Sequence, residues 1–255
     1  MGVSLFFFQL YNSMQDKVHG IVLRTVRYGD TSVIVDMYTR EEGRVSVIAS
    51  SVRKRRGGGG MSLWQPMSMV EVRTDNAGVT KRLPKVKEAA IRYVYNDLPY
   101  SPIKSSIAIF LAEFLCAALR EEGENKPLFA FLENSLQWLD MTDDARALAN
   151  YHIVFITQLS RYIGIWPNTD NTGNYFDMQA GTYTHGQPMH SYFLRPEEAR
   201  YIRVLFRTNY AVMRHLRFSR SGRMRILDVL NTYFRLHVPA FPELRSISVL
   251  HELFD

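Results

Sequence analysis

The sequence predicts an α+β protein in which a small β-barrel precedes a helical domain. Residues 18–96 are rich in β-branched residues that alternate with polar ones, a pattern typical of short strands. From residue 101 onward, apolar residues recur at helical spacing. Residues 164–194 interrupt that spacing with Gly, Asn, Thr, Pro and aromatic residues, which indicates a long irregular loop or a small hairpin.

Five short strands are predicted in the first region. Glu42-Gly43 forms a turn before the third strand, and residues 75–78 form a turn before the fifth. Five strands favour a closed or partly closed barrel, because closure removes exposed edges. The OB-fold is the commonest five-stranded choice, although the number of strands alone does not establish it. The predicted strands are residues 20–27, 32–39, 44–50, 67–73 and 88–95.

Helices follow, beginning where Ser101 can cap and Pro102 can occupy the first helical position. The predicted helices are residues 101–119, 126–139, 144–162, 196–216, 221–237 and 244–254. The expected organisation is a leader of little structural value, an OB-fold domain, and a helical domain with an irregular segment. The leader is residues 1–13, with Met14 as an alternative start, and the OB-fold domain is residues 14–97. The helical domain is residues 98–255, and its irregular segment is residues 164–194.

Composition excludes several classes of protein. The single cysteine, Cys116, excludes an internal disulfide framework and a thiolate-rich zinc site. No stretch is long enough to span a bilayer, and residues 3–10 lack the basic flank and cleavage site of a signal peptide. We therefore expect a cytoplasmic, nucleoid-associated protein with no membrane partner.

No catalytic constellation is recognisable. The sequence has no phosphate-binding loop, no dinucleotide-binding glycine pattern and no nucleophile elbow. Asp170, Asp177, His185 and His190 share the irregular segment, but their spacing matches no metal-ligand pattern. We expect no enzyme activity, no metal and no cofactor, and a hydrolase or nuclease is a distant alternative.

Charge is unevenly distributed along the chain. Residues 14–92 carry 15 Lys+Arg against 8 Asp+Glu, a net +7, and residues 93–199 carry 6 against 13, a net −7. Residues 200–255 carry 10 against 4, a net +6. A basic barrel, an acidic middle and a basic tail indicate that different parts of the chain have different functions.

A basic run followed by glycines is the most informative feature of the barrel region. Arg53, Lys54, Arg55 and Arg56 are followed directly by four glycines, residues 57–60. Four adjacent like charges cannot be buried together, and they suit a polyphosphate backbone. The alternative interpretation is a solvated loop that binds nothing. The remaining charge of the barrel region favours nucleic acid.

Further cations are predicted to form a groove on one side of the barrel, where they would follow a phosphodiester backbone. Trp64, Tyr28 and Tyr38 offer surfaces for base stacking, or alternatively belong to the core. The additional residues predicted to bind DNA are Arg24, Arg27, Arg73, Lys81, Arg82, Lys85 and Lys87.

A second basic set lies in the tail. Arg200, Arg203, Arg207 and Arg214 recur at helical spacing and are predicted to form one stripe. This stripe is either a solvated helix face or a second contact for DNA or an acidic peptide.

Taken in order, these features resemble the bacterial recombination mediator RecO family. The resemblance covers residues 14–255. The stretches that carry it are residues 20–24, 28–35, 38–43 and 49–56, with residues 233–237 and 244–250 near the C-terminus.

The resemblance implies an N-terminal OB-fold, a helical domain and a role in DNA repair. It implies binding of single- and double-stranded DNA, annealing of complementary strands, and help for RecA in replacing the single-stranded-DNA-binding protein, usually with RecR. It also implies docking of the acidic, phenylalanine-ended tail of the single-stranded-DNA-binding protein on the helical domain. We expect Arg200, Arg203, Arg207 or Arg214 to border that pocket. The alternative is an interaction scaffold whose DNA contact is incidental.

One departure from the family concerns zinc. Many RecO proteins have four zinc-binding cysteines in the irregular segment, whereas residues 164–190 have none. Zinc is therefore not implied. Trp166, Tyr175, Phe176 and Tyr183 are expected to stabilise this segment by packing instead.

Overall fold

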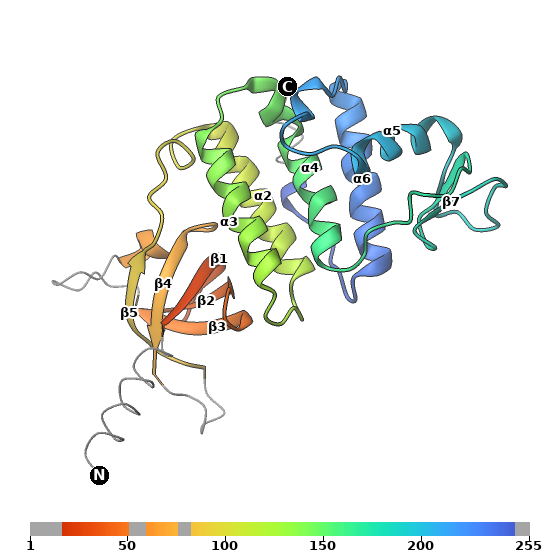
Figure 1. The fold of residues 1–255 in the computed structure, drawn as a ribbon. Coiled ribbons are helices and arrows are strands. Elements are labelled where there is room, and N and C mark those ends of the chain that lie inside the picture. The colour runs from red at the N-terminus through yellow and green to blue at the C-terminus, as the bar shows by residue number, and fades with distance from the viewer. Residues whose placement is uncertain (1–16, 51–59, 76–82, 248–255) are drawn as a thin grey trace, which may run out of the picture. The chain divides into compact units, whose positions relative to one another are not determined.

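The computed structural model describes residues 17–50, 60–75 and 83–247 (Figure 1). The chain divides into two compact units. Of the described residues, one unit contains those from 17 to 96 together with 112–134, and the other contains 97–111 together with 135–247. Among the described residues, no helix has the length and apolar character needed to cross a bilayer.

The first unit contains a five-stranded antiparallel sheet with the order β3-β2-β1-β4-β5. The central strand, β1, pairs with β2 and β4 and has an irregularity between Val22 and Arg24. The sheet closes where Ile48 of β3 forms a parallel bridge with Lys85, just before β5. This closed five-stranded arrangement is the predicted OB-fold. The strands are Lys17–Arg27 (β1), Ser32–Thr39 (β2), Gly43–Ser50 (β3), Met69–Thr74 (β4) and Val86–Ile91 (β5).

Alternation along the strands creates the core of the barrel. Val33, Val35 and Val47 are almost completely buried, while their neighbours in sequence are more exposed. A short 3-10 helix, η1 (Gly60–Trp64), adds Leu63 and Trp64 to the same core. The sequence did not predict η1.

The turn into β3 packs closely against residues 112–134. Gly43 has φ +73°, and a side chain there would place its Cβ 2.2 Å from the backbone of Gly123. The Arg44 amide donates to the Glu122 carbonyl at 2.9 Å, and the Tyr38 hydroxyl donates to the Gly123 carbonyl at 3.0 Å. Glycine is therefore required at position 43 both by its conformation and by the close approach.

The second unit is organised around α4 (Ala145–Tyr162), most of whose residues are buried. Tyr151 stacks on Trp138 and Tyr210 at centroid distances of 5.6 and 5.5 Å. Burial raises the pKa of Tyr210, whose hydroxyl donates to the Ser135 hydroxyl at 2.8 Å. The other helices of the chain are Pro102–Ala118 (α2), Lys126–Met141 (α3), Pro196–Phe206 (α5) and Arg220–His237 (α6).

The predicted helix over 196–216 is wrong beyond Phe206. The Asn209 side chain accepts from the Ala211 amide, which favours a turn over continued helix. Gln158 and Asn150 of α4 donate to carbonyls of the segment after α5, including Thr208 at 2.6 Å and Leu216 at 3.1 Å. This segment contains only a short 3-10 helix, η2 (Met213–His215). The predicted helix over 244–254 lies mostly outside the described residues.

The irregular segment contains a small sheet with the order β7-β6-β8. Phe176 and Tyr183 are buried at a centroid distance of 4.9 Å, and Trp166 packs edge-on against Phe206 at 5.0 Å. Tyr175 packs against Phe193 at 6.0 Å. The expected aromatic packing is confirmed. The strands are Tyr175–Asp177 (β6), Thr182–Thr184 (β7) and Phe193–Leu194 (β8).

Candidate nucleic-acid interface

A polar row crosses the outer face of β1, β2 and β3. Arg24 lies opposite Asp36, which in turn lies opposite Ser46. Asp36 accepts from Ser46 at 2.5 Å and is paired with Arg44 at 3.3 Å. Arg24 is exposed and has no acidic partner within the described ranges. Its charge is therefore available to an anion.

An apolar row lies beside it on the same face. Val26 is opposite Ile34, and Ile34 is opposite Ile48. Ile34 and Ile48 alternate with core residues and therefore face outward. Val26 is 40% exposed, and Tyr28 just beyond it is 54% exposed. Apolar and aromatic surfaces beside a cation suit the faces of unpaired bases.

Three further cations lie near this row or at the rim of the barrel. Arg27 is exposed at the end of β1, opposite Val33. Lys85 is exposed beside Ile48 at the closing bridge, and Lys87 is exposed two residues later. In the part of the chain that the structure describes, these three cations also have no ion pair. They are available for phosphate contact.

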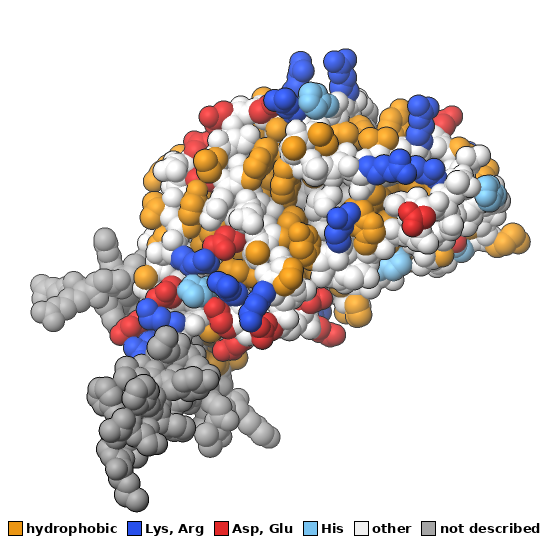
Figure 2. Space-filling model, viewed as in Figure 1, with side chains coloured by type: hydrophobic (Ala, Val, Ile, Leu, Met, Phe, Trp, Pro, Cys, Tyr) orange, Lys and Arg blue, Asp and Glu red, His pale blue; other side chains and the backbone are white. Residues whose placement is uncertain are grey.

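Arg73 lies in a different electrostatic environment. It is opposite Lys17, at the other end of β1 from Arg27, and is 4.0 Å from Glu88. Lys17 is paired with Glu71 at 2.7 Å, and the hydrogen bond from Lys17 lowers the pKa of the Glu71 carboxyl. On the face of the barrel seen in Figure 2, basic and acidic side chains are interleaved. The structure therefore separates Arg73 from the free cations.

The basic run at residues 53–56, together with Lys81 and Arg82, lies outside the described residues. These residues belong to two connections, one between β3 and η1 and one between β4 and β5. The described residues at the ends of both connections adjoin the apolar row. Ser50, the last described residue before the basic run, lies opposite Ser32 at the β1–β2 turn. At the other connection, the Asp75 side chain accepts from the Lys85 amide at 2.8 Å.

Two of the three predicted stacking residues are unavailable. Trp64 is 3% exposed and belongs to the core of the barrel, and Tyr38 is fully buried. Burial also raises the pKa of Tyr38. Of the two alternatives for Trp64, base stacking or a place in the core, the structure supports the core, whereas Tyr28 is accessible. The apolar row was not recognised from sequence, because only the strand register places its three residues side by side.

The four arginines predicted to form one helical stripe occupy different elements. Arg200 and Arg203 lie on α5, Arg207 caps its C-terminus and Arg214 lies in η2. Arg203 donates to the Gly173 carbonyl at 2.7 Å, and its guanidinium lies 3.9 Å from the centre of the Tyr183 ring. The single stripe is wrong because α5 ends at Phe206.

Family models match nearly the whole chain. The model described as "Recombination protein O N terminal" matches residues 14–95, and "Recombination protein O C terminal" matches residues 99–246. The chain belongs to the RecO family. The family resemblance predicted from sequence is confirmed, and RecO membership assigns the chain to DNA repair and recombination.

Relatives named DNA repair protein RecO agree with the family models. That of Phocaeicola vulgatus is 49% identical over 244 residues, which is 95% of this chain and 100% of the relative. The relative from Bacteroides fragilis is 44% identical over 245 residues, which is 95% of this chain and 100% of the relative. That of Porphyromonas gingivalis strain W83 is 32% identical over 241 residues, which is 92% and 97%.

The irregular segment, residues 164–194, contains two histidines, His185 and His190. His190 Nε2 lies 3.2 Å from Asp177 Oδ2, while His185 Nε2 lies 3.5 Å from the Thr172 hydroxyl. Over residues 17–50, 60–75 and 83–247, no group of three or more His, Cys, Asp or Glu side chains is placed to hold a metal. The Asp177 carboxylate also accepts from the amide of Ala180, a turn contact that orders the irregular segment.

Proposed function

We propose that this RecO chain is a non-enzymatic recombination mediator. It binds single- and double-stranded DNA without sequence preference, anneals complementary strands and helps load RecA onto DNA coated by the single-stranded-DNA-binding protein. The observation that carries the proposal is the set of unpaired cations around an apolar row on the OB-fold.

These cations and the apolar row together support both binding modes. Arg24, Arg27, Lys85 and Lys87 attract phosphates, which are present in single strands and duplexes alike. Contact with phosphates carries no sequence information, so binding is general. The apolar row serves only bases whose faces are exposed, and it therefore favours unpaired strands.

Annealing follows from holding a strand by its backbone. Cations at the rim reduce the repulsion between two phosphate backbones, while the edges of the bases remain open to a complementary strand. The residues 53–56 are proposed to provide most of this backbone contact.

A strand-annealing assay tests the proposal. The wild-type chain is compared with a variant in which Arg53, Lys54, Arg55 and Arg56 are all alanine. We expect annealing to be fast with the wild type and strongly reduced with the variant. Absence of annealing by the wild type would favour the alternative, an interaction scaffold whose helical part docks repair partners.

Partners of the proposed function are RecR, the tail of the single-stranded-DNA-binding protein and, indirectly, RecA. For the acidic tail, support comes from a pocket of about 450 Å³ in which two cations, Arg200 and Arg203, outnumber one carboxylate, Glu197. Tyr183, Pro196 and Ala199 also line it. An exposed cation beside apolar groups suits a carboxylate attached to an aromatic ring.

A charge reversal tests tail docking. Arg203 is unsuitable because of its internal contacts, so Arg200 and Arg207, both exposed, are changed to Glu together. We expect a fluorescence titration with the tail peptide to show loss of binding at unchanged melting temperature. Equal affinity for the variant and the wild type would make these arginines a solvated face.

A further inference from the structure

A pocket of about 400 Å³ lies between α5 and the start of α6 and is formed entirely by residues of the second unit. Its apolar lining comes from Ile202, Ile226 and Val229, which are all buried. Tyr201 and Phe218 form its aromatic wall, edge to face at 6.3 Å, and Tyr201 is 57% exposed. An accessible ring at the mouth of an apolar pocket suits a planar ligand.

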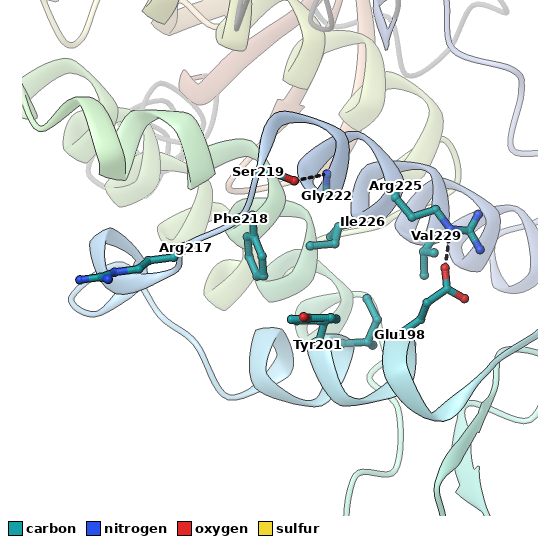
Figure 3. Close-up of a pocket in the computed structure, with 10 residues that line it drawn as sticks. Glu198, Tyr201, Arg217, Phe218, Ser219, Gly222, Arg225, Ile226 and Val229 are labelled. Atoms are coloured by element: carbon teal, nitrogen blue, oxygen red, sulfur yellow. Dashed lines mark hydrogen bonds and ion pairs between the residues drawn. The ribbon is translucent and has the colours of Figure 1, made fainter.

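One end of this pocket carries an unpaired cation and the other end an ion pair. Figure 3 shows Arg217 at one end and Glu198 at the other, with Tyr201 and Phe218 between them. Glu198 is paired with Arg225 at 2.6 Å, so that cation is neutralised. Arg217 is exposed and has no acidic partner among the residues the structure describes.

The surroundings of Arg217 are strongly basic. Residues 214–225 contain five arginines and no acidic residue, and the first turn of α6 has none either. The N-terminus of a helix is already partly positive, so this arrangement opposes the helix dipole. Figure 2 shows basic side chains beside hydrophobic ones on the surface over α5 and α6. A bound anion would relieve the excess of positive charge.

We propose that this pocket is a second site for single-stranded nucleic acid, independent of the barrel and beyond the proposed function. One base stacks on the accessible ring of Tyr201, and its phosphate lies at Arg217. An exocyclic amine on the base donates to Glu198. The order of cation, aromatic wall and carboxylate matches the order of phosphate, ring and amine in a nucleotide.

Glu198 distinguishes a nucleotide from an acidic peptide. Glu198 is paired with Arg225 through Oε1, and its second oxygen can accept a hydrogen bond from a base amine, a donor that the carboxylates of such a peptide lack. Cytosine and adenine have that amine at the pairing edge, whereas thymine does not. We therefore expect short oligo-dC to bind this pocket roughly threefold more tightly than oligo-dT.

Photocrosslinking of the full chain tests the site. Oligo-dC containing 5-iodocytosine is irradiated with the protein, and the crosslinked peptides are identified by mass spectrometry. We expect crosslinks at Tyr201 or Phe218 that are lost in Arg217→Glu. The matched control is Arg235→Glu, which reverses an exposed arginine at the other end of α6 and should retain them.

A binding measurement tests the role of Glu198 alongside the photocrosslinking. In fluorescence anisotropy, Glu198→Ala should abolish the preference for oligo-dC over oligo-dT without lowering affinity, because it also frees Arg225. Crosslinks confined to the barrel, with equal binding of both oligomers, would overturn this site and leave the barrel proposal intact. Crosslinks only at Tyr201 or Phe218 would support this site and contradict DNA binding by the barrel. An acidic peptide that binds through Arg217, with no crosslink to the oligomer in the pocket, would also overturn it.

Discussion

The exposed cations of the barrel and the cations within the second unit have different surroundings. Arg24 and Arg27 are exposed, and in the described part of the chain neither has an acidic partner. In contrast, Arg203 donates to a backbone carbonyl and covers the ring of Tyr183. Lys104 is buried and lies 2.7 Å from Asp97 and 2.8 Å from the Asp140 carbonyl. A positive charge therefore indicates a ligand site only where the structure leaves it without an internal contact.

The largest expected effect of breaking an internal contact is at Lys104. Lys104→Met removes the donor to both Asp97 and the Asp140 carbonyl, and urea denaturation should show a loss of about 3 kcal/mol in the free energy of unfolding. The control is Lys126→Met at a surface pair with Glu124, which should change it by less than about 1 kcal/mol. Equal small effects for both variants would contradict the distinction between a buried lysine with internal contacts and a lysine in a surface ion pair.

The second-largest expected effect is on DNA binding, with no change in stability. Replacing Arg53, Lys54, Arg55 and Arg56 with alanine should weaken DNA binding on the order of a hundredfold at low salt, because about four phosphate contacts are lost. The dependence of affinity on salt should become shallower, and the thermal melt should not change. Replacing the three arginines with lysine preserves charge and should preserve binding. Wild-type affinity in the alanine variant would exclude this run from the interface.

A smaller effect on stability is expected at Arg203. Arg203→Ala loses a hydrogen bond and the contact with the Tyr183 ring, and should cost about 1–2 kcal/mol of unfolding free energy. Its neighbour on α5 provides the control, since Arg200→Ala removes an exposed side chain and should leave the melting temperature unchanged. If Arg200→Ala were the more destabilising change, it would contradict the structural role of Arg203 and the lack of one for Arg200.

The smallest expected effect is that of a chelator. We expect purified protein to contain no stoichiometric zinc, because the irregular segment is held by packing among Phe176, Tyr183 and Phe206. A melt with and without chelator should therefore superimpose. Elemental analysis that finds about one zinc per chain would contradict this and direct attention to Asp170, Asp177, His185 and His190.

Local patterns predicted most elements of this fold. The strand over residues 32–39 and the start of the helix at Pro102 follow from β-branched alternation and from proline at the first helical position. The end of α5 did not follow, since it depends on bonds from α4 to the next segment as well as on Asn209. Side-chain periodicity contains no information about such tertiary contacts.

The candidate site was predictable only as a set of charges. The sequence identified Arg24, Arg27, Lys85 and Lys87, but it could not separate them from Arg73, whose partner Glu88 is on a neighbouring strand. The apolar row needs the pairing of three strands, and the burial of Trp64 depends on where η1 packs. Both are consequences of register and packing, which a single sequence does not specify.

The contact between Gly43 and Gly123 has a consequence for dissecting this protein. A fragment that ends at residue 97 would lose the carbonyls that accept from Arg44 and Tyr38, and it would expose the surface that residues 112–134 cover. Hydrogen exchange should therefore report the β2–β3 hairpin and residues 119–123 opening together, as one cooperative segment. An isolated barrel for binding studies should carry the helical hairpin that follows it in the chain.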